Sequence, residues 1–130
     1  MILITGGIGQ GKHKFAADLL HCDANSLTDG CSCELSDVPG CSCITDYHIL
    51  VRRLMDNGID PVGFTEQLCR EYPDTVVVMD EIGCGIVPLD RGERIWRENT
   101  GRCGCIIADN SHTVIRMVCG IPISIKGELP

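Results

Sequence analysis

The sequence has no hydrophobic run long enough to cross a membrane and no excess of basic residues. A membrane-spanning helix needs about 20 consecutive apolar residues, and no segment of this chain approaches that length. Lysine and arginine number 11 against 18 aspartate and glutamate residues, a formal net charge of -7. Sequence-independent binding of nucleic acid needs clustered positive charge, so we expect neither a nucleic-acid nor a membrane partner. Any binding of phosphate is therefore expected to be local.

The chain also shows no export signal. Its first residues form a short strand-like run, and not a charged segment followed by a long apolar stretch and a cleavage site. We therefore expect a cytoplasmic protein. The length of 130 residues, of which 44% are hydrophobic and 22% charged, is typical of one globular domain that spans residues 1–130.

Cysteine is abundant, with ten residues. Without an export signal, we expect reduced thiols rather than disulfides. In three pairs the cysteines are separated by a single residue: Cys31 and Cys33, Cys41 and Cys43, and Cys103 and Cys105. The first two pairs offer four thiolates, which is a ligand set for a metal ion. The alternative, which we favour, is that cysteine serves here as a small buried apolar residue.

The start of the chain has the spacing of a phosphate-binding loop. A β-rich run over residues 1–5 is broken at once by glycines, and Gly6, Gly11 and Lys12 fit the pattern GxxxxGK. Glycines let successive backbone N–H groups turn inward around a phosphate, and the next helix adds its free N–H groups. Lys12 would bring a positive charge to the outer phosphates. The predicted nucleotide-binding residues are Gly6, Gly7, Ile8, Gly9, Gln10, Gly11, Lys12 and His13.

His13 departs from this pattern, because Ser or Thr normally stands there and offers a hydroxyl to magnesium. A glycine-rich turn can also serve only to let a helix pack closely on a strand. We favour nucleotide binding, because the motif follows a buried type of strand and opens a good helical run over residues 14–20.

Strand and helix patterns alternate along the rest of the chain. The predicted strands are residues 1–5, 41–45, 75–79, 113–119 and 123–126. The predicted helices are residues 12–21, 47–57, 61–72 and one that starts near Arg91. Residues 22–40 have neither period and are expected to form an irregular Cys-rich loop, with short strand pieces at the Cys pairs. This order predicts an α/β fold of P-loop type, a three-layer sandwich with a mostly parallel sheet.

Acidic residues follow the strand predicted at residues 75–79. In a doubly wound sheet this strand ends at the same edge as residues 1–5, where ligands bind. Asp80 at that edge is suited to hold Mg²⁺, and Glu81 to orient or deprotonate an attacking hydroxyl. Lys12 and Glu81 are therefore the candidate catalytic residues. The alternative is that both acids only end a strand in water.

Asp46 is a second candidate ligand for Mg²⁺, because it also ends a strand at the predicted ligand edge. It is placed to cap the following helix as well. Further along the chain, Arg91, Arg94 and Arg97 recur in steps of three and would neutralise phosphates. The alternative is a solvated helix face on which Glu93 pairs with Arg97.

Two parts of the chain, about residues 1–20 and 76–130, together resemble a known family. The early part is Ile2–Gly7 with Gly11 and Lys12. The later part is Asp80–Pro88, Arg94, Trp96, Arg97, Gly101, Arg102, Ala108, Asp109, Gly120–Pro122 and Lys126. These residues resemble the adenosylcobinamide kinase / adenosylcobinamide-phosphate guanylyltransferase family.

The resemblance implies a cytoplasmic α/β enzyme of vitamin B12 assembly. In that family GTP or ATP phosphorylates the adenosylcobinamide hydroxyl with Mg²⁺, and a guanylyl group is then transferred through a covalently modified histidine. It also implies a helix that continues through Gly101 and Gly104, and homo-oligomers. The family segment with the modified histidine has no counterpart here, since the pattern around His48 does not match. A nucleotide-binding module of corrinoid metabolism without turnover, and a thiolate metal-binding protein, stay open as alternatives.

Overall fold

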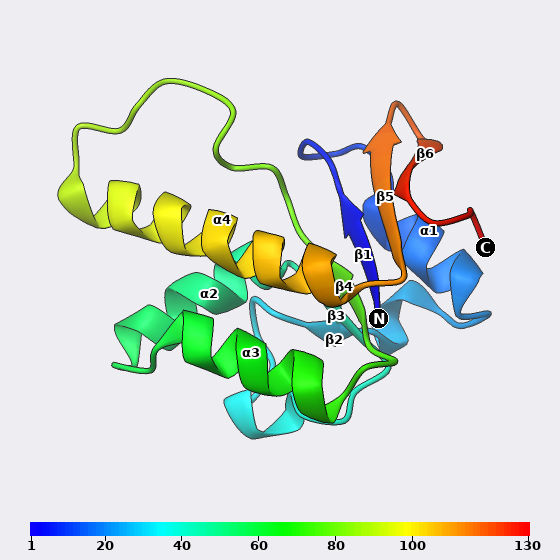
Figure 1. The fold of residues 1–130 in the computed structure, drawn as a ribbon, viewed down its shortest axis with the longest axis horizontal. Helices are drawn as coiled ribbons and strands as arrows, with labels where there is room; N and C mark the ends of the chain where they lie inside the picture. Colours follow the sequence, from blue (N-terminus) through cyan, green and yellow to red (C-terminus); the bar gives the residue numbers. More distant parts are fainter.

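The computed structural model describes residues 1–130 and contains the strands and helices of an α/β protein (Figure 1). The strands are β1 (Ile2–Thr5), β2 (Thr28–Asp29), β3 (Cys43–Thr45), β4 (Val76–Val78), β5 (Thr113–Val118) and β6 (Ile121–Lys126). The α-helices are α1 (Lys12–Leu19), α2 (Tyr47–Asp56), α3 (Pro61–Glu71) and α4 (Arg91–Asn110), and two short 3₁₀ helices are η1 (Ala24–Ser26) and η2 (Leu35–Asp37). None of the helices combines the length and the apolar character that a bilayer span requires.

The strands form one six-stranded sheet in the order β2-β3-β4-β1-β5-β6. Every neighbouring pair is parallel except β5 with β6. The predicted α/β fold with a mostly parallel sheet is therefore confirmed. Because β1, β2, β3, β4 and β5 all point the same way, the segments that follow them leave the sheet at one edge.

Neighbouring residues in the buried strands face opposite layers. In β1, Ile4 belongs to a hydrophobic cluster with Ala16 of α1, whereas Leu3 belongs to a second cluster with Leu54 of α2 and Ile107 of α4. All residues of β4 are buried, as predicted for a strand covered on both faces. Figure 1 shows α1 on one side of the sheet and α2, α3 and α4 on the other, so the predicted three layers are present.

Helix α4 runs without a break through Gly101 and Gly104, as the family resemblance implied. Its N-terminus is capped as predicted, because the Asp90 carboxylate accepts the N–H of Glu93 at 2.9 Å. A Cβ added at Gly104 would lie 3.4 Å from the Cε of Met79. A glycine inside a helix costs about 1 kcal/mol relative to alanine. Close packing of α4 on the sheet offsets this cost at Gly104.

Residues 22–40 are mainly irregular, as predicted, but the short strand piece expected at Cys31 and Cys33 is not present. The strand in this segment is β2, which ends before Cys31, and β3 begins only at Cys43. Asp29 explains why β2 stops. Its carboxylate accepts the Cys31 N–H and the Ser32 hydroxyl, both at 2.8 Å, and so folds the chain into a turn.

The last strand is longer than expected and pairs antiparallel with β5. Cys119 and Gly120, which connect the two strands, have positive φ angles of 50° and 79°. Two such residues make the tight turn that a two-residue hairpin requires. At the other end of β6, the Lys126 ammonium donates to the carbonyls of Ala108 and Asp109 at 2.9 and 3.0 Å, and so ties this strand to the C-terminus of α4.

Removal of buried side-chain volume from β5 is expected to destabilise the fold. Ile115 is fully buried, whereas Ile125 on β6 is 60% exposed. We expect Ile115→Ala to lower the free energy of unfolding by about 2–5 kcal/mol, because it loses apolar burial and leaves a cavity. Ile125→Ala is the matched control and should change it by less than about 0.5 kcal/mol. Urea denaturation measures both, and equal effects would contradict the assigned burial.

Candidate nucleotide-binding site

The glycine-rich segment between β1 and α1 forms a loop at the carboxyl edge of the sheet. Gly6, Gly9 and Gly11 have φ angles of 142°, 72° and 88°, which side chains rarely allow. A Cβ at Gly6 would also lie 2.6 Å from the carbonyl oxygen of Met117. No side chain caps the N-terminus of α1. The first N–H groups of this helix are therefore free to bind an anion.

Lys12 begins α1 and is buried, with 5% of its surface exposed. Its ammonium donates to the carbonyl of Gly7 and forms an ion pair with Asp80, both at 2.6 Å. Asp80 stands beside the loop because β4 pairs with β1, and Glu81 even donates its N–H to the carbonyl of Gly6. The structure thus brings the predicted lysine and the predicted acid together.

Asp46 lies at the same edge but does not cap α2 with its side chain, so that part of the prediction is wrong. Its backbone is left-handed, with φ 50° and ψ 40°. The carboxylate turns instead toward α1, where its Oδ2 lies 3.2 Å from the Nε2 of His13. A strained φ at a non-glycine residue is typical of a functional position.

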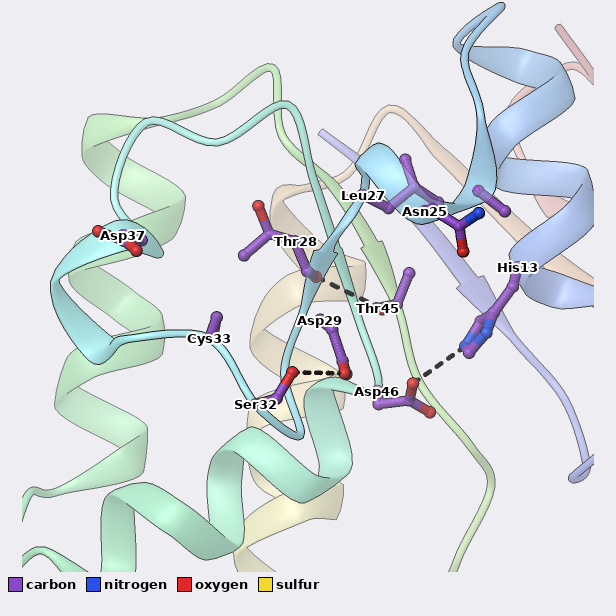
Figure 2. A pocket seen from close by; sticks show the side chains of 11 residues that line it. His13, Asn25, Leu27, Thr28, Asp29, Ser32, Cys33, Asp37, Thr45 and Asp46 are labelled. Carbon is purple, nitrogen blue, oxygen red and sulfur yellow. Dashed lines mark hydrogen bonds and ion pairs between the residues drawn. The ribbon is translucent and has the colours of Figure 1, made fainter.

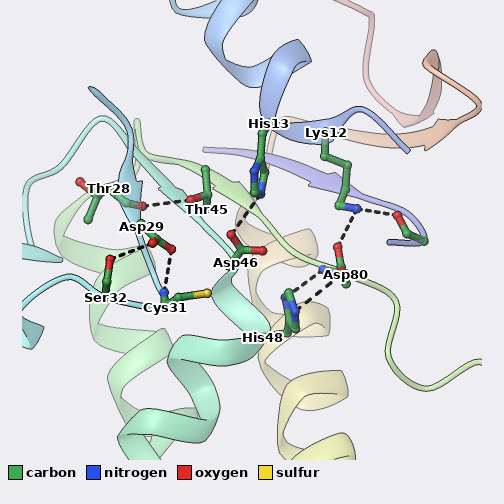
Figure 3. A network of polar contacts seen from close by, with 11 residues as sticks. Lys12, His13, Thr28, Asp29, Cys31, Ser32, Thr45, Asp46, His48 and Asp80 are labelled. Atoms are coloured by element: carbon green, nitrogen blue, oxygen red, sulfur yellow. Dashed lines mark hydrogen bonds and ion pairs between the residues drawn. The ribbon is translucent and has the colours of Figure 1, made fainter. Parts of the chain in front are cut away.

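These residues enclose a cavity of about 330 Å³ between the loop and the two acids. Figure 3 shows Lys12, His13, Asp46 and Asp80 facing one another across this edge. The cavity is lined by Ile8, Gly9, Gln10, Gly11, Lys12, His13, Lys14, Asp46 and Asp80. It combines backbone N–H donors and a cation on one wall with carboxylates on the other. Such a surface suits a phosphate chain together with a divalent cation.

His48, on α2, is a site residue for which the sequence reasoning found no role. Its Nδ1 accepts the N–H of Asp80 at 3.2 Å, and its Nε2 lies 3.7 Å from the Asp80 carboxylate. The Trp96 indole holds this helix turn by donating to the carbonyl of His48 at 2.7 Å. Burial lowers the pKa of His48, although the nearby charges of Asp80 and Asp46 oppose this shift. The only indication of this role in the sequence is that His48 stands two residues after Asp46.

Glu81 lies beside this cavity rather than in its wall. Its carboxylate accepts two hydrogen bonds from the Arg116 guanidinium of β5, at 2.9 and 2.8 Å. It lines a second cavity of about 380 Å³, which Asp80 also lines, with apolar side chains from Leu3, Met79 and Val114. Glu81 therefore stands at the boundary between the phosphate loop and a more apolar space under α4.

The arginines at the start of α4 contact the segment before the helix. Arg94 donates to the carbonyls of Pro88 and Leu89, at 3.3 and 3.2 Å, and Arg97 donates to the carbonyl of Ile86 at 2.7 Å. Arg91 is exposed. Figure 1 shows that α4 begins far from the loop between β1 and α1. The phosphate contacts predicted for these arginines stay predictions, and the structure gives Arg94 and Arg97 a structural partner.

Glu93 pairs with Arg52 of α2 at 2.5 Å, so the pairing with Arg97 that the sequence suggested is wrong. The four thiols considered as a metal site do not gather either. Cys31 is exposed near Asp29 and Asp46, whereas Cys43 is buried on the α1 side of the sheet. Cys33 and Cys41 pack against the cluster on the opposite side. Most of these cysteines therefore serve as apolar packing residues, as favoured from the sequence.

A mostly parallel sheet with a glycine-rich strand-to-helix loop at its carboxyl edge defines an α/β protein with a P-loop-type three-layer fold. Residues 60–125, about half of the chain, match a family described as cobinamide kinase / cobinamide phosphate guanyltransferase. The chain belongs to this family, which is enzymatic, uses nucleoside triphosphates and acts in cobalamin biosynthesis. A search among curated proteins finds no match. The loop at Gly6–Lys12 and Asp46 lie outside the matched residues.

Acidification is expected to destabilise the fold through His48. Burial holds the pKa of His48 below its ordinary value of 6.5, so the folded protein resists a proton that the unfolded chain accepts. The free energy of unfolding should therefore fall as the pH drops below about 6.5, until the lowered pKa of the folded state is passed. His48→Asn keeps an acceptor for the Asp80 N–H and should flatten this part of the profile. Urea denaturation between about pH 7.5 and pH 5 measures the difference, and parallel profiles would contradict it.

Proposed function

We propose that this protein binds GTP or ATP with Mg²⁺ and transfers the γ-phosphoryl group to the side-chain hydroxyl of adenosylcobinamide. Membership of the family supports a nucleotide and a cobinamide as the two substrates. The observation that carries the proposal is the cavity of about 330 Å³, in which the glycine loop and Lys12 face Asp46 and Asp80. The setting we infer is the cytoplasm, and the substrates are small molecules.

The loop residues Gly6–His13 bind the phosphate chain in this proposal. The free N–H groups at the start of α1 and the backbone of the loop donate to phosphate oxygens. Lys12 neutralises the outer phosphates, as its ammonium already points into the cavity wall between Gly7 and Asp80. Catalysis by these groups consists of positioning the phosphates and stabilising their charge.

Asp80 and Asp46 are the proposed ligands of Mg²⁺. The two carboxylates line the same cavity, and Asp80 pairs with Lys12 through Oδ1, while its Oδ2 lies 3.7 Å from the Nε2 of His48. Mg²⁺ prefers one or two carboxylates together with water and phosphate oxygens, which fits this donor set. When bound, Mg²⁺ would neutralise charge on the phosphates. His13 replaces the usual hydroxyl ligand and instead contacts Asp46.

Glu81 is proposed to orient the acceptor hydroxyl. It stands between the phosphate cavity and the apolar cavity of about 380 Å³ under α4, and its two hydrogen bonds from Arg116 hold the carboxylate in a fixed orientation. The hydroxyl oxygen forms a bond to the γ-phosphorus while the bond from that phosphorus to the bridging oxygen of the nucleoside diphosphate breaks. The hydroxyl proton passes to Glu81 or to water.

Loss of the Lys12 charge is expected to weaken nucleotide binding. A hydrogen bond to a charged group contributes about 1.5–3 kcal/mol, so Lys12→Met should raise the Kd of the Mg²⁺–nucleotide about 10-fold to 150-fold. Arg70→Met removes one exposed positive charge from α3 and is the matched control, with an unchanged Kd. Isothermal titration of GTP and ATP measures both. Equal affinities for the wild type and Lys12→Met would overturn the assigned loop.

The turnover itself is tested with adenosylcobinamide and GTP or ATP labelled at the γ-phosphate. We expect label to appear in adenosylcobinamide phosphate, and Asp80→Asn to lower the rate at saturating Mg²⁺ by at least about 100-fold, the usual scale for loss of a group that stabilises transferred charge. A parallel reaction with α-labelled GTP detects guanylyl transfer separately. Nucleotide binding without labelled product would replace the proposed enzyme with a binding module.

A further inference from the structure

A group of mixed donor atoms lies next to the phosphate loop, on the far side of Asp46. One donor atom each from Asp29, Cys31 and Asp46 lies within 4.8 Å of the others. In Figure 3 the Cys31 sulfur points toward Asp46. Asp29 ends β2, Cys31 lies in the turn that follows, and Asp46 directly follows β3; these segments are brought together because the two strands are parallel neighbours.

His13 adds an imidazole to this group from a third segment, the start of α1. Its Nε2 lies 3.2 Å from the Oδ2 of Asp46. The group therefore offers one nitrogen, one sulfur and two carboxylates. An acidic cluster alone has only oxygen donors, whereas this combination is the one that zinc and similar ions bind.

The turn that carries Asp29 and Cys31 is held in place by its surroundings. The Asp29 carboxylate accepts the N–H of Cys31 and the hydroxyl of Ser32, both at 2.8 Å. Arg53 of α2 donates to the carbonyls of Gly30 and Cys33, at 2.9 and 2.7 Å. A Cβ at Gly30 would lie 2.5 Å from the carbonyl of Thr45, so glycine allows the turn to approach β3. Such outer contacts orient metal ligands in proteins.

Three of the four donor residues border a cavity of about 640 Å³ that opens to solvent (Figure 2). His13, Asp29 and Asp46 line this cavity, while His13 and Asp46 also line the phosphate cavity. An ion can therefore enter from the solvent side without passing through the nucleotide site. Water can complete its coordination from the cavity.

We propose that His13, Asp29, Cys31 and Asp46 form a second metal site, which binds a zinc-type divalent transition ion. A thiolate and an imidazole disfavour Mg²⁺ and Ca²⁺, which prefer oxygen ligands throughout. Ligands of tetrahedral zinc lie about 3.3–3.8 Å apart, given bond lengths of about 2.0–2.3 Å. The donor atoms of Asp29, Cys31 and Asp46 lie within 4.8 Å of one another, and rotation of the exposed Cys31 side chain brings its sulfur into that range.

Asp46 links this site to the nucleotide cavity. Its Oδ2 already faces His13, so the second oxygen remains available on the side of Asp80. Asp46 would then be shared by the two proposed sites, because it lines both cavities. The ion would fasten the turn after β2 to the beginning of α1. The proposal does not depend on the kinase activity, because the metal alone can be tested without nucleotide.

The test is a titration of the reduced, metal-free full chain with Co²⁺ and then Zn²⁺, in the absence of nucleotide. We expect one equivalent of Co²⁺ to give the near-ultraviolet thiolate-to-cobalt band and Zn²⁺ to displace it. Cys31→Ser should remove this band and weaken zinc binding by about 100-fold or more, and Ser32→Ala, which loosens Asp29, by about 10-fold. The control is Cys105→Ser, which removes an exposed thiol on α4, outside the proposed site, and should keep the band.

Two results would overturn the proposal. One is a thiolate band that survives in Cys31→Ser, which would place the ion on other cysteines. The other is zinc binding that His13→Asn and Asp29→Asn leave unchanged. Because Cys31 is exposed and Asp29 is only partly buried, these variants are expected to fold, and urea denaturation checks that they do. A failure of the zinc proposal would not change the outcome expected for nucleotide binding in Lys12→Met, so the two proposals can be distinguished.

Discussion

Parallel pairing around β1 is the constraint on which the whole site depends. The register of Ile4 with Val78 and of Ile44 with Val77 fixes where each strand ends. The glycine loop, Asp46 and Asp80 then leave the sheet side by side, although they are far apart in the sequence. A slip of one residue would turn every side chain of a strand to the opposite face. Burial of β4 on both faces therefore stabilises the fold and aligns the acids with Lys12.

The ion pair between Lys12 and Asp80 sets the charge of the cavity. Both side chains are mostly buried, with 4% and 14% of their surface exposed. Removal of two charges from water is costly unless each is paired and hydrogen-bonded, and the Gly7 carbonyl provides such a hydrogen bond to the Lys12 ammonium. An anionic phosphate that binds Lys12 would leave Asp80 without its partner. A cation that arrives with the phosphate restores the balance, which is a physical reason for a metal–nucleotide complex here.

Sequence patterns predicted β1, β3, β4, β5 and β6, three helices, the start of α4 and the common edge, because glycine spacing and runs of β-branched residues are local signals. Asp46 and Asp80 were placed correctly at that edge for the same reason. Sequence patterns missed the two-residue strand β2, and the course of α4 through its glycines came from the family resemblance. The left-handed backbone of Asp46 was not predictable, because its carboxylate responds to His13 on another element. The role of His48 depends on contacts with Asp80 and with Trp96, which is 48 residues away along the chain. Such pairings appear only when the sheet is assembled.

The hairpin of β5 and β6 has a consequence for how this protein avoids aggregation. An open sheet has two borders, and each offers unpaired backbone groups to a strand of another molecule. One border here is β2, which is only two residues long. The other is β6, where Pro122 has no N–H to donate and Lys126 brings a charge that is bound to the end of α4. The short length of β2 limits strand pairing at one border, and Pro122 together with the bound Lys126 limits it at the other.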